Sequence, residues 1–192
     1  MNNMNLIFKK SNSIDLNKKG FTLIETLVAI SILSLSILAG FTAVQNGLKA
    51  SLTAKNQITA FYLVQEAMEF VKNKRDGNAL IYVDTGLGNW LNGLSLCDAT
   101  SLTTYCQIDS PADRVTTCGG ENTSCELIRI QPTTGLHGYD VSWTPTNFKR
   151  AISYQRSSTN PDEATVTVWI SWTQGTQTKT FQVTETLFNR LQ

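Results

Sequence analysis

Glu25 is the only formally charged side chain in an apolar run from Phe21 to Val44. At about 1.5 Å per residue, these 24 residues make a helix of about 36 Å, enough to cross a hydrocarbon core of about 30 Å once. An ionised side chain at the bilayer centre costs about 2.5 to 3.5 kcal/mol, so Glu25 either has a function or avoids this cost. It avoids the cost if it reaches the headgroups or is protonated, because it lies about 6 Å from the start of the run. In the functional case it needs a positively charged partner.

The residues around Glu25 favour the functional interpretation. Lys18, Lys19 and Gly20 precede the segment Phe21 to Glu25, and a helix rich in Leu, Ile, Val, Ala and Ser follows it. This arrangement closely resembles the class III signal of type IV pilins and type II secretion pseudopilins. An ordinary secretory signal fits less well, because its apolar core usually has about 7 to 15 residues and its small-residue cleavage site follows that core.

The resemblance implies a processing step and a mode of assembly. In that family a membrane-embedded prepilin peptidase cuts after the glycine on the cytoplasmic side, here between Gly20 and Phe21, and methylates the new N-terminal Phe21. Glu25 then becomes the fifth residue of the mature chain and meets the N-terminal ammonium of a neighbouring pilin subunit. Two charges that are each unfavourable in an apolar core thereby neutralise each other. A head-to-tail contact of this kind does not close and generates a helical filament.

The charge distribution agrees with a membrane-tethered protein whose bulk lies outside the cytoplasm. The chain has 192 residues and a net charge of +1. Residues 1–20 carry four lysines and one aspartate, or +3, which leaves −2 on the remainder. A basic leader stays in the cytoplasm by the positive-inside rule. We therefore expect a single-pass protein of the inner or cytoplasmic membrane, which later joins a cell-surface or periplasmic filament.

The apolar run continues into a segment with helical periodicity. Residues 45–76 contain no proline, and Phe61, Val64, Met68 and Val71 recur at spacings of three and four. Lys72 to Gly77 supplies basic residues and then a glycine, which is typical of a helix C-terminus. The sequence predicts one helix over residues 21–76, with 21–44 as membrane or filament core and 45–76 as an amphipathic half.

Residues 77–192 are predicted to form one globular head with an antiparallel sheet. Strands are expected at 126–131, 139–143, 148–156, 164–173 and 178–187, with a turn at Gln174, Gly175 and Thr176 joining the last two. Alternating apolar residues in 164–173 predict that one face of that strand packs on the long helix. The predicted fold class is α+β, a helix laid across an antiparallel sheet.

Four cysteines lie in the predicted head, where disulfides can form. Three pairings are possible. We favour Cys97 with Cys106 and Cys118 with Cys125, because the second pair brackets a turn-rich segment, residues 119–122. A zinc site is the alternative, but eight and six intervening residues differ from the short spacings that such sites usually have.

Other candidate sites carry weaker signals, and no cofactor or metal is expected. His137 is the only histidine, and no motif ties a nucleophile or acid to it, so a solvent-facing or core role is expected rather than catalysis. Oxygen ligands for calcium and a basic-aromatic patch for nucleic acid are also conceivable, but solvated loop carboxylates and ordinary sheet-edge charges explain these residues better. The carboxylates are Asp109, Asp113 and Glu121, and the patch comprises Lys149, Arg150 and Arg156 with Phe148 and Tyr154.

Together these observations predict a non-enzymatic minor type IV pilin. Residues 65–69 and 74–76, with the ending 165–187, look most like the PilV-type branch of minor pilins and pseudopilins. The expected partners are other pilin subunits, the prepilin peptidase and methyltransferase, the membrane, and the inner-membrane pilus or secretion machinery. A type II secretion pseudopilin is the nearest alternative. The alternative outside the filament proteins is a binding module with a single-pass anchor that never polymerises. Such an anchor would not require Glu25.

Overall fold

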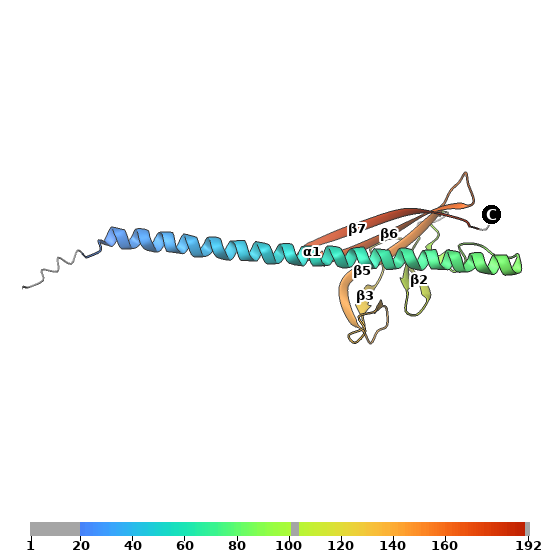
Figure 1. The fold of residues 1–192 in the computed structure, drawn as a ribbon, viewed down its shortest axis with the longest axis horizontal. Coiled ribbons are helices and arrows are strands. Elements are labelled where there is room, and N and C mark those ends of the chain that lie inside the picture. Colours follow the sequence, from blue (N-terminus) through green and yellow to red (C-terminus); the bar gives the residue numbers. More distant parts are fainter. Residues whose placement is uncertain (1–19, 101–103, 191–192) are drawn as a thin grey trace, which may run out of the picture. The chain divides into compact units, whose positions relative to one another are not determined.

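A computed structural model describes residues 20–100 and 104–190, and it contains one long helix and an antiparallel sheet (Figure 1). Helix α1 spans Leu23–Thr85, and a short 3-10 helix, η1, spans Ser95–Cys97. The chain divides into two compact units, residues 1–48 and residues 49–192.

In the first unit, α1 is apolar and all its side chains are exposed. An 18-residue window within α1 has a mean hydropathy of 2.3, and none of that window is buried, so this helix is long and apolar enough to cross a membrane. Three of its hydroxyls bond within the helix: Ser31, Ser36 and Thr42 each donate to the carbonyl four residues earlier, at 2.8 to 2.9 Å. These bonds satisfy the hydroxyls where water is absent, so they fit an apolar environment.

The predicted helix end at Asp76 is wrong, because α1 continues to Thr85. The Asn78 amide donates to the carbonyls of Trp90 and Asn92, at 3.1 and 2.9 Å, and so holds the returning chain against the extra helical turns. Gly86, rather than the predicted Gly77, is the glycine that ends the helix. Its φ is +67°, and its N–H donates to the Tyr82 carbonyl at 2.7 Å.

The second unit contains a seven-stranded antiparallel sheet built around β5. One edge of β5 pairs with β1 and β3, and the other pairs with β6, which pairs in turn with β7; β2 extends β1, and β4 extends β3. The strands are β1 (Tyr105–Asp109), β2 (Arg114–Gly119), β3 (Leu127–Ile130), β4 (His137–Gly138), β5 (Thr144–Arg156), β6 (Glu163–Gln174) and β7 (Gln177–Phe188). The α+β fold class is therefore confirmed.

Sequence patterns located the long strands better than the short ones. Strands β3, β5, β6 and β7 overlap the predicted ones, whereas β1 and β2 were not predicted. The strand expected at 139–143 is wrong: the Asp140 carboxylate accepts hydrogen bonds from the Ser142 N–H and hydroxyl, at 2.9 and 2.7 Å, and this local bonding favours a turn. The strand in this region is β4, which ends at Gly138, just before the predicted segment.

The hairpin of β6 and β7 has the predicted turn. Gln174 pairs with Gln177 across the two residues Gly175 and Thr176, and Gly175 has a φ of +64°, which suits the first position of a tight hairpin turn. The apolar residues of β6 alternate as predicted and are buried: Ala164, Val166, Val168, Ile170 and Trp172.

The second half of α1 packs on the inner face of the sheet. Leu63, Val64, Ala67, Met68 and Val71 of α1 belong to one buried cluster with the apolar residues of β5 and β6. Polar contacts fix both ends of this packing: the Gln174 amide donates to the Thr53 hydroxyl at 2.9 Å, and Lys72 pairs with Glu185 at 2.9 Å. Phe61 departs from its predicted place in this core, because 54% of it is exposed.

Candidate functional site

Glu25 lies in the first turn of α1 and forms a reciprocal cap with Thr22. The Thr22 N–H and hydroxyl donate to the Glu25 carboxylate at 3.3 and 3.2 Å, and the Glu25 N–H donates to the Thr22 hydroxyl at 3.3 Å. This is the capping-box arrangement, in which a hydroxyl residue and a Glu three positions later satisfy two free N–H groups of a helix start. The sequence analysis noted the acid but missed this local role, although the Thr-x-x-Glu spacing signals it.

The carboxylate of Glu25 is exposed, so a positively charged group can still approach it. Phe21 and Ile24 beside it are exposed, and Gly20 and Phe21 precede the helix. A negative charge at a helix N-terminus is favoured by the helix dipole, so the isolated chain keeps Glu25 in place before any partner arrives. Cleavage at Gly20 and pairing of Glu25 with another subunit stay predictions at this point.

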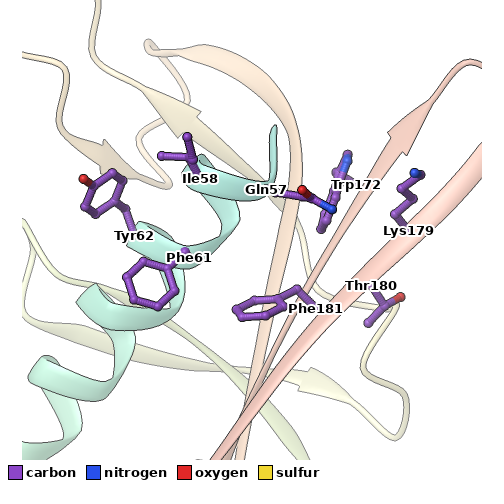
Figure 2. A pocket seen from close by; sticks show the side chains of 8 residues that line it. All are labelled: Gln57, Ile58, Phe61, Tyr62, Trp172, Lys179, Thr180 and Phe181. Carbon is purple, nitrogen blue, oxygen red and sulfur yellow. The ribbon is translucent and has the colours of Figure 1, made fainter. Parts of the chain in front are cut away.

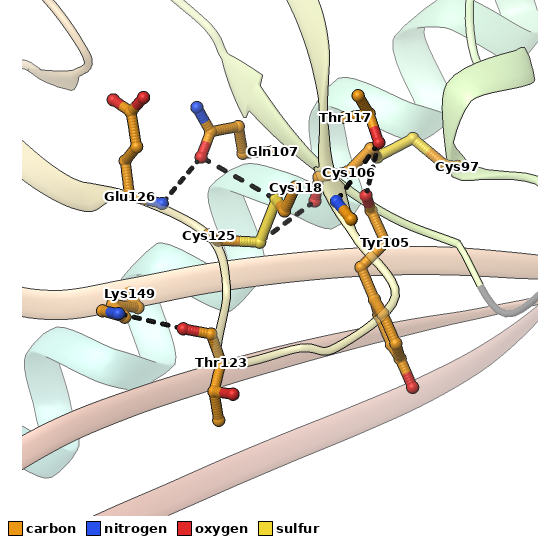
Figure 3. The surroundings of a disulfide bond; sticks show 11 residues. Cys97, Tyr105, Cys106, Gln107, Thr117, Cys118, Thr123, Cys125, Glu126 and Lys149 are labelled. Carbon is orange, nitrogen blue, oxygen red and sulfur yellow. Dashed lines mark hydrogen bonds between the residues drawn. A yellow bond between two sulfur atoms is a disulfide. The ribbon is translucent and has the colours of Figure 1, made fainter.

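Two disulfides crosslink the first part of the head (Figure 3). Cys97 of η1 bonds Cys106 of β1, and Cys118 of β2 bonds Cys125 just before β3. These are the pairs that the sequence analysis favoured. The Gln107 side-chain oxygen accepts the Glu126 N–H at 3.0 Å beside the second disulfide, and so ties the same loop to β1.

Arg150 is wholly buried and connects three elements, which the sequence analysis missed. Its guanidinium donates to the carbonyls of Leu63 in α1 and Ile108 in β1, at 3.1 and 2.9 Å, and pairs with Glu66 at 3.2 Å. Its assignment to a sheet-edge charge or a nucleic-acid patch is therefore wrong. The alternation of β5 did contain the signal, because Arg150 has the same parity as the buried Phe148, Ile152 and Tyr154.

The other two basic residues of the proposed patch also have partners. Lys149 donates to the Thr123 carbonyl at 2.9 Å, and Arg156 lies 3.6 Å from Asp98. Burial alone would raise the pKa of the Asp98 carboxyl, but hydrogen bonds from Thr100 and Tyr154, with the charge of Arg156, lower it overall. The contacts of Asp98 hold the loop that follows η1 against β5, and the bond from Lys149 holds the loop between β2 and β3 against the same strand.

The candidate calcium ligands each have a partner of their own. Asp109 pairs with Arg114 at 3.4 Å, Asp113 pairs with Lys74 at 2.8 Å, and Glu121 accepts a bond from the Thr123 hydroxyl at 3.3 Å. Asp109 is buried in β1, so the expectation of a solvated loop carboxylate is wrong for this residue. In the described ranges, no cluster of three or more His, Cys, Asp or Glu side chains is arranged to hold a metal.

His137 lies half-buried in β4, near Glu66 and Ser110. Burial lowers the pKa of its imidazole, Glu66 opposes this effect, and the charge of Arg150 adds to it. This environment favours the neutral form of the imidazole.

Comparison with known proteins locates one family signature. Residues 15–41 match the model of the prokaryotic N-terminal methylation motif. No curated protein and no solved structure matches the chain. The match includes Lys18, Lys19, Gly20, Phe21 and Glu25, and most of the apolar run over residues 21–44. The chain thus carries an N-terminal methylation motif, which supports the type IV pilin or pseudopilin class and points to a membrane-anchored structural subunit.

Proposed function

We propose that this chain is a minor type IV pilin of the PilV-type branch. In this proposal residues 1–20 are a leader, and prepilin peptidase removes it between Gly20 and Phe21 and methylates Phe21. The single observation that carries the proposal is the methylation motif over residues 15–41, placed at the start of a helix whose first, apolar part is exposed. A large exposed apolar surface on a single chain indicates a membrane or protein partner.

The apolar helix has two successive environments in this proposal. Residues 21–44 span the inner or cytoplasmic membrane once, with the basic leader inside and the head outside. The filament then replaces the lipid around the same side chains with the helices of other pilin subunits. Residues 45–76, with the observed extension to Thr85, carry the head formed by the rest of the chain.

Glu25 sets the register of assembly in this proposal. Before assembly its carboxylate accepts bonds from Thr22. On assembly the methylated ammonium of a neighbouring Phe21 pairs with it, which neutralises two charges that the apolar filament core would otherwise hold separately. The cap therefore holds the acid at the first helical turn until the ammonium arrives.

The first experiment tests processing. The full-length chain is expressed with and without a prepilin peptidase, extracted from membranes, and analysed by intact-mass and peptide mass spectrometry. The expected product is a peptidase-dependent chain that starts at methylated Phe21. An uncleaved chain would instead indicate a plain membrane anchor, and cleavage after Val44 would indicate an ordinary secreted protein.

A second experiment separates the charge of Glu25 from its capping role. Glu25→Gln keeps a side-chain acceptor for the cap but removes the charge, whereas Thr22→Ala removes the cap and keeps the charge. We expect Glu25→Gln to block incorporation into filaments and Thr22→Ala to permit it, as measured by immunoblotting sheared filaments against the membrane pool. Equal incorporation of both variants would contradict a charge-pairing role. Recovery only in periplasmic secretion complexes would favour a type II secretion pseudopilin.

A further inference from the structure

An apolar groove opens between α1 and the β6–β7 hairpin. Its volume is about 610 Å³, and its walls are Gln57, Ile58, Phe61 and Tyr62 of α1, with Trp172 of β6 and Lys179, Thr180 and Phe181 of β7. Figure 2 shows Phe61 on α1 and Phe181 on β7 among the side chains that line this groove. Ile58, Phe61 and Tyr62 are each more than half exposed, which is unusual for three large apolar side chains in one helical turn and a half.

The groove combines apolar walls with groups that lack partners. The side-chain ammonium of Lys179 has no ion pair or hydrogen bond within the described residues. None of the described residues that line the groove is acidic. Trp172 is 4% exposed, and its indole N–H is buried without an acceptor in the described part of the head. An unpaired ammonium beside apolar walls favours a ligand with an apolar body and an anionic group.

The wall formed by β7 is also a free sheet edge. Within residues 104–190, β7 pairs only with β6, along all twelve of its residues. In a two-residue hairpin the flanking pair, here Gln174 and Gln177, exchanges hydrogen bonds, so the odd-numbered residues of β7 bond β6. The N–H and C=O groups of the even-numbered residues, Thr180 and Gln182 among them, therefore point outward from the sheet.

We propose that the β7 edge and this groove together bind an extended peptide segment of another protein. The peptide adds a strand to β7 through the outward groups of Thr180 and Gln182, and its side chains on the inner face enter the groove. Lys179 and Phe181 are two residues apart on that face, so the favoured peptide carries a carboxylate opposite Lys179 and an aromatic side chain opposite Phe181, separated by one residue. The proposal does not depend on processing or filament assembly.

Charge explains why the partner is an acidic-aromatic strand rather than any apolar chain. Glu185, the other charged residue on the inner face of β7, is already paired with Lys72 at 2.9 Å. This leaves Lys179 as the charge on β7 that a ligand can satisfy. Inward-pointing charges on an edge strand discourage unspecific pairing, so an approaching strand must neutralise Lys179 to bind.

The experiment uses the full chain in detergent micelles and a fluorescein-labelled synthetic peptide. In the probe, Thr and Val alternate around a central Asp-Thr-Phe, and the matched control peptide has Lys in place of Asp. We expect saturable binding of the Asp peptide by fluorescence anisotropy, with a Kd at least about tenfold lower than that of the Lys peptide. Lys179→Glu should reverse this preference, and a reversal cannot result from unfolding.

Backbone pairing is tested with Thr180→Pro, which removes an outward N–H and is tolerated on an edge strand. We expect this variant to weaken the Asp peptide at least about tenfold, whereas Lys49→Glu, a charge reversal away from the groove, leaves the Kd unchanged. Absence of saturable binding by the wild type would overturn the proposal, as would binding that neither Lys179→Glu nor Thr180→Pro alters. Self-association of the wild type that Thr180→Pro abolishes, without peptide binding, would overturn it in favour of a second copy.

Discussion

The guanidinium of Arg150 lies 3.2 Å from the carboxylate of Glu66, and this ion pair joins the central strand β5 to helix α1. The two partners differ in environment, because the Arg150 side chain is fully buried and that of Glu66 is 30% exposed. Removing Glu66 therefore leaves a charge in the core that still donates to two carbonyls. Removing Arg150 leaves a carboxylate that water can reach, but it also takes the donor from the carbonyls of Leu63 and Ile108. The two deletions should differ accordingly.

We expect Glu66→Leu to lower the free energy of unfolding by about 2 to 3 kcal/mol, below the value for a fully buried pair because Glu66 contacts water. Arg150→Met should cost more, because the carbonyls of Leu63 and Ile108 then lose their donor as well. The double variant should cost less than the sum of the two single variants. Urea unfolding followed by circular dichroism measures all three. Glu69→Leu, on the exposed side of α1, is the control and should change stability little. Equal losses for both single variants would contradict the asymmetry.

Each disulfide should stabilise the head by restricting the unfolded chain. For loops closed by residues nine and seven positions apart, chain entropy predicts about 2.5 kcal/mol each. Replacing Cys97 and Cys106 by alanine should cost more than replacing Cys118 and Cys125, because Cys97 and Cys106 are both buried among the core residues. Urea unfolding of the two double variants measures the difference. A larger loss for the Cys118 and Cys125 variant would contradict it.

Gly77 and Gly86 should respond oppositely to alanine. Gly77 lies within α1 with open space around it, so Gly77→Ala should stabilise the head by about 1 kcal/mol through helix propensity. Gly86 has a φ of +67°, so Gly86→Ala should destabilise the head by about 1 kcal/mol. Thermal unfolding distinguishes the two signs. Destabilisation by Gly77→Ala would show that α1 ends near Asp76 in solution.

The stability of the head should fall as the pH drops below about 6.5, the ordinary pKa of histidine. Burial lowers the pKa of His137 in the folded head, so the unfolded chain binds a proton that the folded chain does not. Stability that is present above the unfolded pKa is then lost progressively until the pH reaches the folded pKa. Urea midpoints at pH 7.5 and 5.5 measure this loss.

His137→Asn provides the matched control, because His137 is the only histidine of the chain. The variant should lose less stability over the same pH interval than the wild type. An unchanged difference between the two midpoints would exclude His137 as its source.

The sequence by itself determined the features that depend on local pattern. The apolar run with Glu25, the alternation in β6 and the turn at Gly175 all follow from periodicity, charge and the conformational preferences of single residues, and the structure has the helix, the strand and the hairpin that they predict. The long helix and the sheet fix the α+β class for the same reason. Periodicity is strong over such long elements.

Only the tertiary structure decided which residues those elements bring together. A basic residue in a strand is ordinarily placed in solvent, and Arg150 is buried because carbonyls from α1 and β1 and the Glu66 carboxylate converge on it. The extension of α1 to Thr85 likewise depends on contacts outside the helix, the bonds from Asn78 to the carbonyls of Trp90 and Asn92. Long-range partners of this kind leave no periodic trace in the sequence, because each belongs to a different element.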